Sequence, residues 1–299
     1  MDVYKLLPSD TGFRYINRDN FEEDTKRRER WYRPNSGGAD SHFAVCPVCD
    51  NPIQIINLYP KIIHTLPTYG KHTCKTIPDL AHDDPVTRER CPYFKPQKHE
   101  PTDRKPGPDA TTTKILTILI EQFDRVVFLL RQQTGISLSV TKLRSMLETY
   151  RKETGYLYTG ATVMNVPWVF AYMSNAVPLF AQHIRGNTKL INDIQSRVPG
   201  ADVDANGRVG KKTGTHQWFD LTVSYIHHRF VKAQEEGGLK EHMTLVVSCE
   251  SKGTLVNIYK EKIEFDYQYF QNLIGQAEGI GRRDLKLVEL AREVLGDLI

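Results

Sequence analysis

The chain has 299 residues, of which 39% are hydrophobic and 25% charged, and its formal net charge is +4 at pH 7. It is long enough for two domains, and no apolar run reaches the roughly 18 residues that a membrane-spanning helix needs. Residues 1–10 lack the apolar segment of a secretory signal. These features exclude a membrane protein and an exported disulfide scaffold, and they predict a cytoplasmic location.

Residues 1–42 are predicted to form an irregular arm. The segment 26–33 is basic and contains two aromatic residues, so it could follow a nucleic-acid backbone while an aromatic ring stacks on a base. The candidate contact residues are Arg27, Arg28, Arg30 and Trp31. The alternative is a solvated helix face, because four acidic residues between positions 22 and 29 offset the basic charge.

The turn Cys46-Pro-Val-Cys49 predicts a metal site. A C-x-x-C turn points both thiolates at one ion, and clustered cysteines in a protein that is not exported indicate a metal rather than disulfides. This turn resembles the zinc knuckles at the front of DNA-processing proteins of bacteria and their mobile elements. The resemblance covers residues 43–95 and implies neither an activity nor a catalytic residue.

A structural zinc ion takes four ligands in a tetrahedron, so two more are expected. Cys91 is the third candidate, and the fourth is either His72 or Cys74, which lie two residues apart. Both donor types serve zinc, so the sequence leaves this choice open. Residues 43–95 are therefore predicted to form a zinc-binding module, ordered by the ion because the segment is poor in core residues. Buried free cysteines and a catalytic zinc are the alternatives.

The main domain is predicted to begin after a proline-rich linker at 96–110. Apolar residues then recur at helical spacing. Helices are expected from 111 to Gly135, over 139–153, from 166, and over 187–198, 266–276 and 283–298; strands are expected over 221–231, 243–249 and 254–259. The predicted fold class is α+β: an N-terminal zinc-bound, loop-rich module, followed at 111–299 by a mainly helical domain with a small antiparallel β-sheet.

Two groups of charged residues in this domain suggest contact with nucleic acid. Asp220, Glu250 and Lys252 are similar to the site of PD-(D/E)xK nucleases, in which carboxylates hold Mg²⁺ and a lysine assists the attacking water. The alternative, which the sequence favours, is that the Glu-Ser-Lys-Gly segment is an ordinary hairpin turn. In the glycine-rich loop at 199–215, Lys211 and Lys212 could contact phosphates, and a solvated loop is the alternative.

The leading hypothesis is a zinc-containing protein that binds nucleic acid, or that serves in a nucleic-acid-processing or antiviral defence complex. Zn²⁺ is the expected structural cofactor. One alternative is a Mg²⁺-dependent nuclease that uses the Asp220 group, for which alone Mg²⁺ would be needed. The other is a non-catalytic subunit with structural zinc that binds a protein partner or a second copy of itself.

Overall fold

The computed structural model describes all residues except 35–39, 61–66, 233–237, 252 and 277–282. Two compact units form within the described chain. Unit 1 comprises Met1–Lys98 together with Phe230–Glu241, and unit 2 comprises His99–Arg229 and His242–Ile299. Each unit has its own buried apolar residues, so each is considered by itself.

Unit 1 is built around a four-stranded antiparallel sheet of order β3-β4-β5-β6. Its elements are β1 (Val3–Tyr4), β2 (Arg14–Tyr15), α1 (Arg18–Thr25), β3 (Tyr32–Pro34), β4 (Asp40–Val45), β5 (Pro52–Ile56), β6 (Tyr69–His72) and α2 (Pro85–Glu89). Asn17 caps the start of α1, because its side chain accepts a hydrogen bond from the Asn20 amide. The ring of the fully buried Phe21 then packs on Tyr4, with ring centroids 5.3 Å apart.

The N-terminal segment is part of this unit and differs from the irregular arm expected from the sequence. Lys5 exchanges two backbone hydrogen bonds of 2.9 Å with Val45 at the end of β4. The Met1 ammonium donates to the Gly70 carbonyl, and the Gly70 amide donates to Met1, both at 2.8 Å. These contacts link residues more than 35 positions apart, which local sequence patterns cannot reveal.

The helices of unit 2 begin and end largely where the sequence places them. They are α3 (Ala110–Glu121), α4 (Phe123–Thr134), α5 (Val140–Lys152), α6 (Val166–Tyr172), α7 (Thr188–Arg197), α8 (Tyr267–Ile274) and α9 (Leu285–Leu295), with short 3₁₀ turns at Gly155–Leu157 and Gly296–Leu298. Ser139 caps α5 through its side chain, and Gly135 ends α4 with a φ of 73°. The long helix expected from 111 is two helices, because the backbone at Gln122 leaves the helical conformation (φ −119°, ψ 19°).

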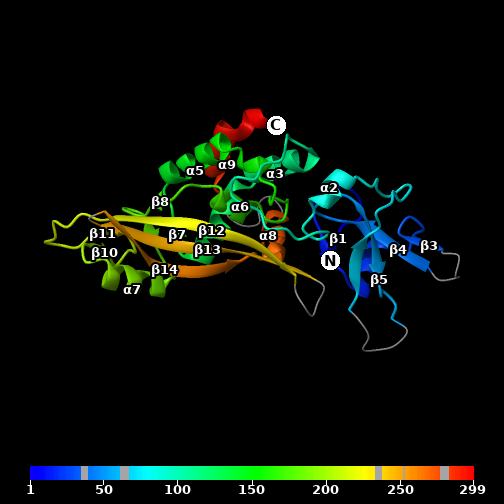
Figure 1. Ribbon diagram of the computed structural model, residues 1–299, viewed down its shortest axis with the longest axis horizontal. Helices are drawn as coiled ribbons and strands as arrows, with labels where there is room; N and C mark the ends of the chain where they lie inside the picture. The colour runs from blue at the N-terminus through cyan, green and yellow to red at the C-terminus, as the bar shows by residue number, and fades with distance from the viewer. Residues whose placement is uncertain (35–39, 61–66, 233–237, 252, 277–282) are drawn as a thin grey trace. The chain divides into compact units, whose positions relative to one another are not determined.

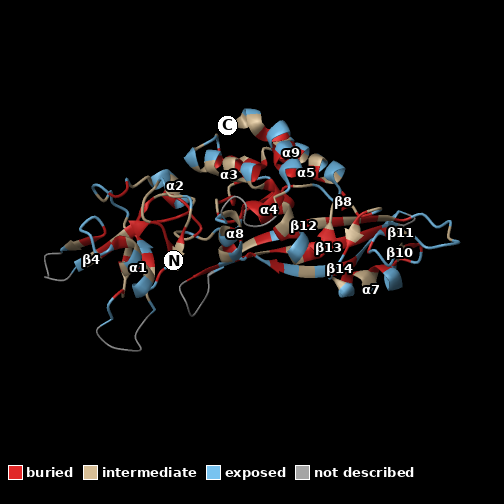
Figure 2. Ribbon diagram, turned by 180° about the vertical axis from the view of Figure 1, so that it is seen from behind, coloured by how far each residue is buried: buried red, intermediate tan, exposed pale blue. Residues whose placement is uncertain are grey.

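The strands of unit 2 are longer than expected. Its main sheet has the order β14-β13-β12-β8, and helices α3, α5 and α9 lie on one side of it (Figure 1). The strands are β7 (Ile136–Ser137), β8 (Val177–Pro178), β9 (His183–Ile184), β10 (Ala201–Val203), β11 (Val209–Lys211), β12 (Asp220–Lys232), β13 (Leu239–Ser251) and β14 (Thr254–Glu264). Figure 2 shows mostly buried residues on α4 and along β13, whereas buried and half-buried residues alternate along most of β12. The α+β class holds, but the mainly helical description does not: 34% of the structure is helix and 27% strand.

The predicted linker packs on unit 2 from His99 onward. The Lys105 amide donates to the Leu157 carbonyl at 2.7 Å, and Arg104 forms a β-bridge with Tyr158. His99 is buried, and its Nδ1 lies 2.8 Å from the Thr159 hydroxyl. The prolines and charged residues of this segment therefore do not keep it from packing on unit 2, because backbone hydrogen bonds hold it there. Among the described helices, none is both long and apolar enough to cross a membrane.

One buried ion pair joins α4 to the start of α9. Two nitrogens of the Arg283 guanidinium, Nε and Nη2, donate to the Asp124 carboxylate at 2.7 and 3.0 Å, and the side chain of Asp124 is only 5% exposed. Removing one partner of a buried pair leaves an uncompensated charge and typically costs about 3 kcal/mol. We expect Asp124→Asn to lower the free energy of unfolding by about that amount, measured by urea denaturation and circular dichroism.

The matched control is Glu293→Gln, which breaks the exposed bidentate pair that Glu293 forms with Arg144. Exposed pairs contribute about 1 kcal/mol or less, so this variant should unfold close to the wild type. Equal losses in the two variants would contradict the structural role of the Asp124 pair.

Candidate metal centre

The C-x-x-C turn connects β4 to β5 in unit 1. The last residue of β4, Val45, pairs with the first of β5, Pro52, so the six residues between them must reverse the chain. The Cys46 amide donates to the Asn51 carbonyl at 2.8 Å, and the Asp50 amide donates to Cys46 at 3.1 Å. Asp50 takes a left-handed conformation, with a φ of 59°. This tight reversal brings both thiols to the same side.

The third thiol arrives on the segment that follows α2. Asp84 caps α2, and Cys91 lies just beyond the end of this helix, where its amide donates to the Arg88 carbonyl at 2.9 Å. The buried Asn51 ties this segment to the C-x-x-C turn: its amide group donates to Thr87 Oγ1 at 2.9 Å, and its carbonyl accepts from the Asp84 amide at 2.7 Å. The position of Cys91 is thus fixed relative to the first two thiols.

His72 is the fourth member of the group. It ends β6, where it pairs with Ile53 of β5, and the edge of its ring faces Phe94 at a centroid distance of 5.4 Å. Cys74, two residues later, is exposed and has a φ of 53°. Of the two candidates that the sequence could not separate, the structure brings His72 to the cluster and leaves Cys74 outside it.

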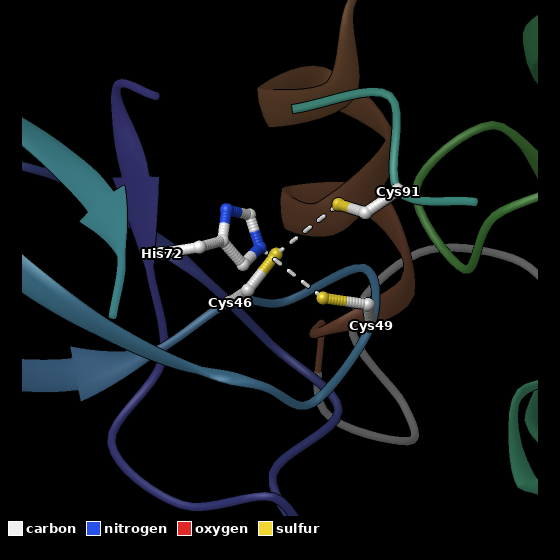
Figure 3. A group of neighbouring side chains, drawn as sticks. All are labelled: Cys46, Cys49, His72 and Cys91. Atoms are coloured by element: carbon white, nitrogen blue, oxygen red, sulfur yellow. Dashed lines mark hydrogen bonds between the residues drawn. The ribbon is translucent and has the colours of Figure 1, made fainter. Parts of the chain in front are cut away.

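The four side chains point toward one another (Figure 3). Their ligand atoms all lie within 4.8 Å of one another; the Cys46 and Cys91 sulfurs are 3.7 Å apart, and the Cys49 sulfur is 3.3 Å from His72 Nε2. Zinc–sulfur bonds of about 2.3 Å in a tetrahedron imply sulfur–sulfur distances of about 3.8 Å. All four residues are buried. The cluster could therefore hold one metal ion.

Burial and hydrogen bonding give the three thiols different acidities. Burial raises the pKa of Cys49 and of Cys91 well above the usual value of a thiol. Burial also opposes ionisation of Cys46, but hydrogen bonds with Cys49, Cys91 and His72 outweigh it and lower the Cys46 pKa well below its usual value. Three thiolates at these distances require a cation to offset their repulsion, so metal binding would release protons.

The predicted nuclease residues are only partly described. Asp220 is the first residue of β12, and Glu250 is an exposed residue near the end of β13. Lys252 lies outside the described residues. The negative charge of Asp220 acts on the neighbouring Cys249, whose pKa is raised mainly by burial and also by that carboxylate. Within the described chain, the Cys46 cluster is the one group of three or more potential ligands. The nuclease site stays a prediction.

The basic residues of the N-terminal segment are exposed, but the aromatic residue is not. Arg27, Arg28 and Arg30 are exposed, and Arg27 donates to the Glu22 carboxylate at 2.7 Å. Trp31 is 7% exposed, and its indole nitrogen donates to the Leu6 carbonyl at 3.2 Å. The expected stacking of Trp31 on a base is therefore wrong, because the ring belongs to the core of unit 1.

Lys211 and Lys212 are exposed as expected, at the end of β11 and just after it. Trp218, which follows them and is 58% exposed, was not predicted from the sequence. A tryptophan in a polar segment, beside His216 and Gln217, was the available signal. Asn51 was not predicted either, because its partners in the α2 segment are more than 30 positions away.

Comparisons of the chain with family models, with curated proteins and with solved structures found no match. The function therefore has to be argued from the site and from the surfaces of the two units.

Exchange of one sulfur for oxygen tests the ligand set. We expect Cys46→Ser to lose most of the bound zinc, because a serine hydroxyl is a poor zinc ligand at neutral pH. Unit 1 should then become sensitive to protease, since its metal-binding segment loses its anchor. Metal content by mass spectrometry and limited proteolysis measure the two effects.

Cys74→Ser is the matched control, because it makes the same chemical change two residues from His72 in an exposed thiol. This variant should keep the zinc content and protease resistance of the wild type. Zinc loss in Cys74→Ser with full retention in Cys46→Ser would reverse the assignment of ligands.

Proposed function

We propose that Cys46, Cys49, His72 and Cys91 hold one Zn²⁺ ion with a structural role. The observation that carries this proposal is the closed set of four buried donors at near-tetrahedral spacing. Three thiolates and one imidazole fill the coordination sphere of zinc, so no position remains for a reacting water or a substrate. Soft thiolate donors also favour zinc over magnesium or calcium. The ion would join the β4–β5 turn, the end of β6 and the α2 segment.

We further propose that the chain binds nucleic acid, alone or within a nucleic-acid-processing or defence complex. The support in unit 1 is the turn that ends α1. Lys26 and Arg27 take left-handed conformations, with φ values of 49° and 55°, and this turn presents exposed Lys26, Arg28 and Arg30 to solvent. Arg27 is offset by Glu22. Exposed cations of this kind supply the sequence-independent part of binding to phosphates.

Salt dependence separates this proposal from the alternatives. Binding that neutralises phosphates releases counterions, so the affinity falls as salt rises. A plot of the logarithm of the binding constant against the logarithm of the salt concentration has a slope of about −0.7 per phosphate contact for a single strand. We expect the variant Lys26→Gln/Arg28→Gln/Arg30→Gln to bind a labelled oligonucleotide more weakly at low salt and to reduce the slope by about 2. Fluorescence anisotropy at several salt concentrations measures both.

The control changes three exposed cations of unit 2 by the same charge: Lys152→Gln/Lys286→Gln/Arg292→Gln. It should leave the slope unchanged. Equal slopes for the Lys26 variant and the wild type would contradict contact at this turn. Absence of binding even at low salt would favour the protein-interaction subunit. Cleavage of DNA in Mg²⁺ that Glu250→Ala abolishes would favour the nuclease.

A further inference from the structure

Unit 2 contains a cavity at one end of its main sheet, with a volume of about 210 Å³. It lies between the end of α7, the start of β12 and the β13–β14 hairpin. Figure 1 shows α7, β10 and β11 together at this end of the sheet. Its lining includes Arg197, Gly200, Gln217, Phe219, Cys249 and Val256. None of them has been given a role above.

The walls of the cavity suit a flat, mostly apolar ring. Phe219 is buried, whereas Val256 is 52% exposed and leaves one side open to solvent. Gln217 adds an amide that can donate and accept hydrogen bonds at the cavity wall. A cavity of about 150 Å³ holds one benzene molecule, so about 210 Å³ suffices for a six-membered ring with exocyclic groups.

An exposed aromatic residue and two cations lie beside this cavity. Trp218, between the two cavity residues Gln217 and Phe219, is 58% exposed. The Lys212 amide donates to the carbonyl of Gly200, a cavity residue, at 3.0 Å, so the chain at Lys211 and Lys212 is held against the cavity wall. A large exposed ring next to cations is the combination that proteins use to stack bases and follow phosphates.

The charges around the cavity restrict where phosphates can run. Arg197 is at the wall and donates to the Ile258 carbonyl, and Lys211 and Lys212 are exposed. Asp220 and Glu250 carry negative charge near the wall residue Cys249: Glu250 follows it in the chain and is exposed, and the carboxylate of Asp220 helps to raise the pKa of Cys249. A phosphate is therefore favoured close to Lys211 and Lys212 and disfavoured close to the two carboxylates.

We propose that this cavity takes one pyrimidine base of a single-stranded nucleic acid, with Trp218 stacked on a neighbouring base and Lys211 and Lys212 at the phosphates. This inference rests on the proposed nucleic-acid binding and adds a site and a strand type to it. A base in a duplex cannot enter, because its ring stays within the stack. Base and phosphate contacts are thus made by different side chains, so they can be tested separately.

The test compares two probes of equal length and charge: a 12-nucleotide oligothymidylate and the same strand without bases. The wild type should bind the thymidylate strand about tenfold more tightly than the abasic strand. Trp218→Ala should lose most of that difference and keep the salt slope, whereas Trp218→Phe should keep most of the difference. Val256→Trp, which fills the cavity mouth, should act like Trp218→Ala. Lys211→Gln/Lys212→Gln should weaken both probes equally and lower the slope.

Each contrary outcome has a separate meaning. Wild-type protein that binds both probes equally, with Trp218→Ala unchanged, would overturn the base site and leave nucleic-acid binding intact. Wild-type protein that binds neither probe at low salt would overturn both proposals. A wild-type dimer that Trp218→Ala converts to monomer, measured by analytical ultracentrifugation, would assign this surface to a second copy of the chain and overturn the base site. Melting temperatures of all variants verify that they are folded.

Discussion

The convergence of three thiols and one imidazole in a buried space is the constraint on which unit 1 depends. The four donors come from three segments that are remote in sequence, and burial alone opposes ionisation of each thiol. A divalent cation bound to the four donors would convert this unfavourable group into a cross-link. The surrounding contacts hold the donors in place: Asn51 joins the C-x-x-C turn to the α2 segment, and the Lys5 ammonium pairs with Asp50 of the same turn at 2.6 Å. A bound ion would add a cross-link to these contacts and to the buried apolar residues of the segment, such as Val45, Ile53 and Leu58.

Because four buried donors would leave no open position on a metal ion, the proposed function is placed on the surfaces of the two units. Neither surface that supports the proposed binding includes any of the four ligands: the turn at Lys26 follows α1, and the cavity beside Trp218 belongs to unit 2. The two surfaces also differ in chemistry, because the first offers cations alone and the second offers an apolar cavity, an exposed ring and cations. In the two proposals, phosphates are contacted by cations of both units, whereas bases are contacted by unit 2 alone.

Local signals in the sequence predicted the helices of unit 2 well, but not the helices and most of the strands of unit 1. Ser139 before α5 and Gly135 after α4 are caps whose effect depends on a few neighbouring residues, and the C-x-x-C turn fixes its own geometry. What the sequence could not predict depends on distant contacts. Trp31 lies in a basic segment with the composition of a surface, but its ring is in the core, where the Leu6 carbonyl accepts its hydrogen bond. His72 joins the cluster, and Cys74 does not, because β6 pairs with β5. The spacing of residues in the sequence does not predict this pairing.

X-ray absorption spectroscopy at the zinc edge of the purified, full-length protein tests the central claim most directly. It reports the number and type of atoms around the ion without any substitution in the chain. The account predicts three sulfur neighbours at about 2.3 Å and one nitrogen at about 2.0 Å, with no further light atom in the first shell. Protein that contains no zinc, or zinc surrounded by nitrogen and oxygen alone, would contradict it.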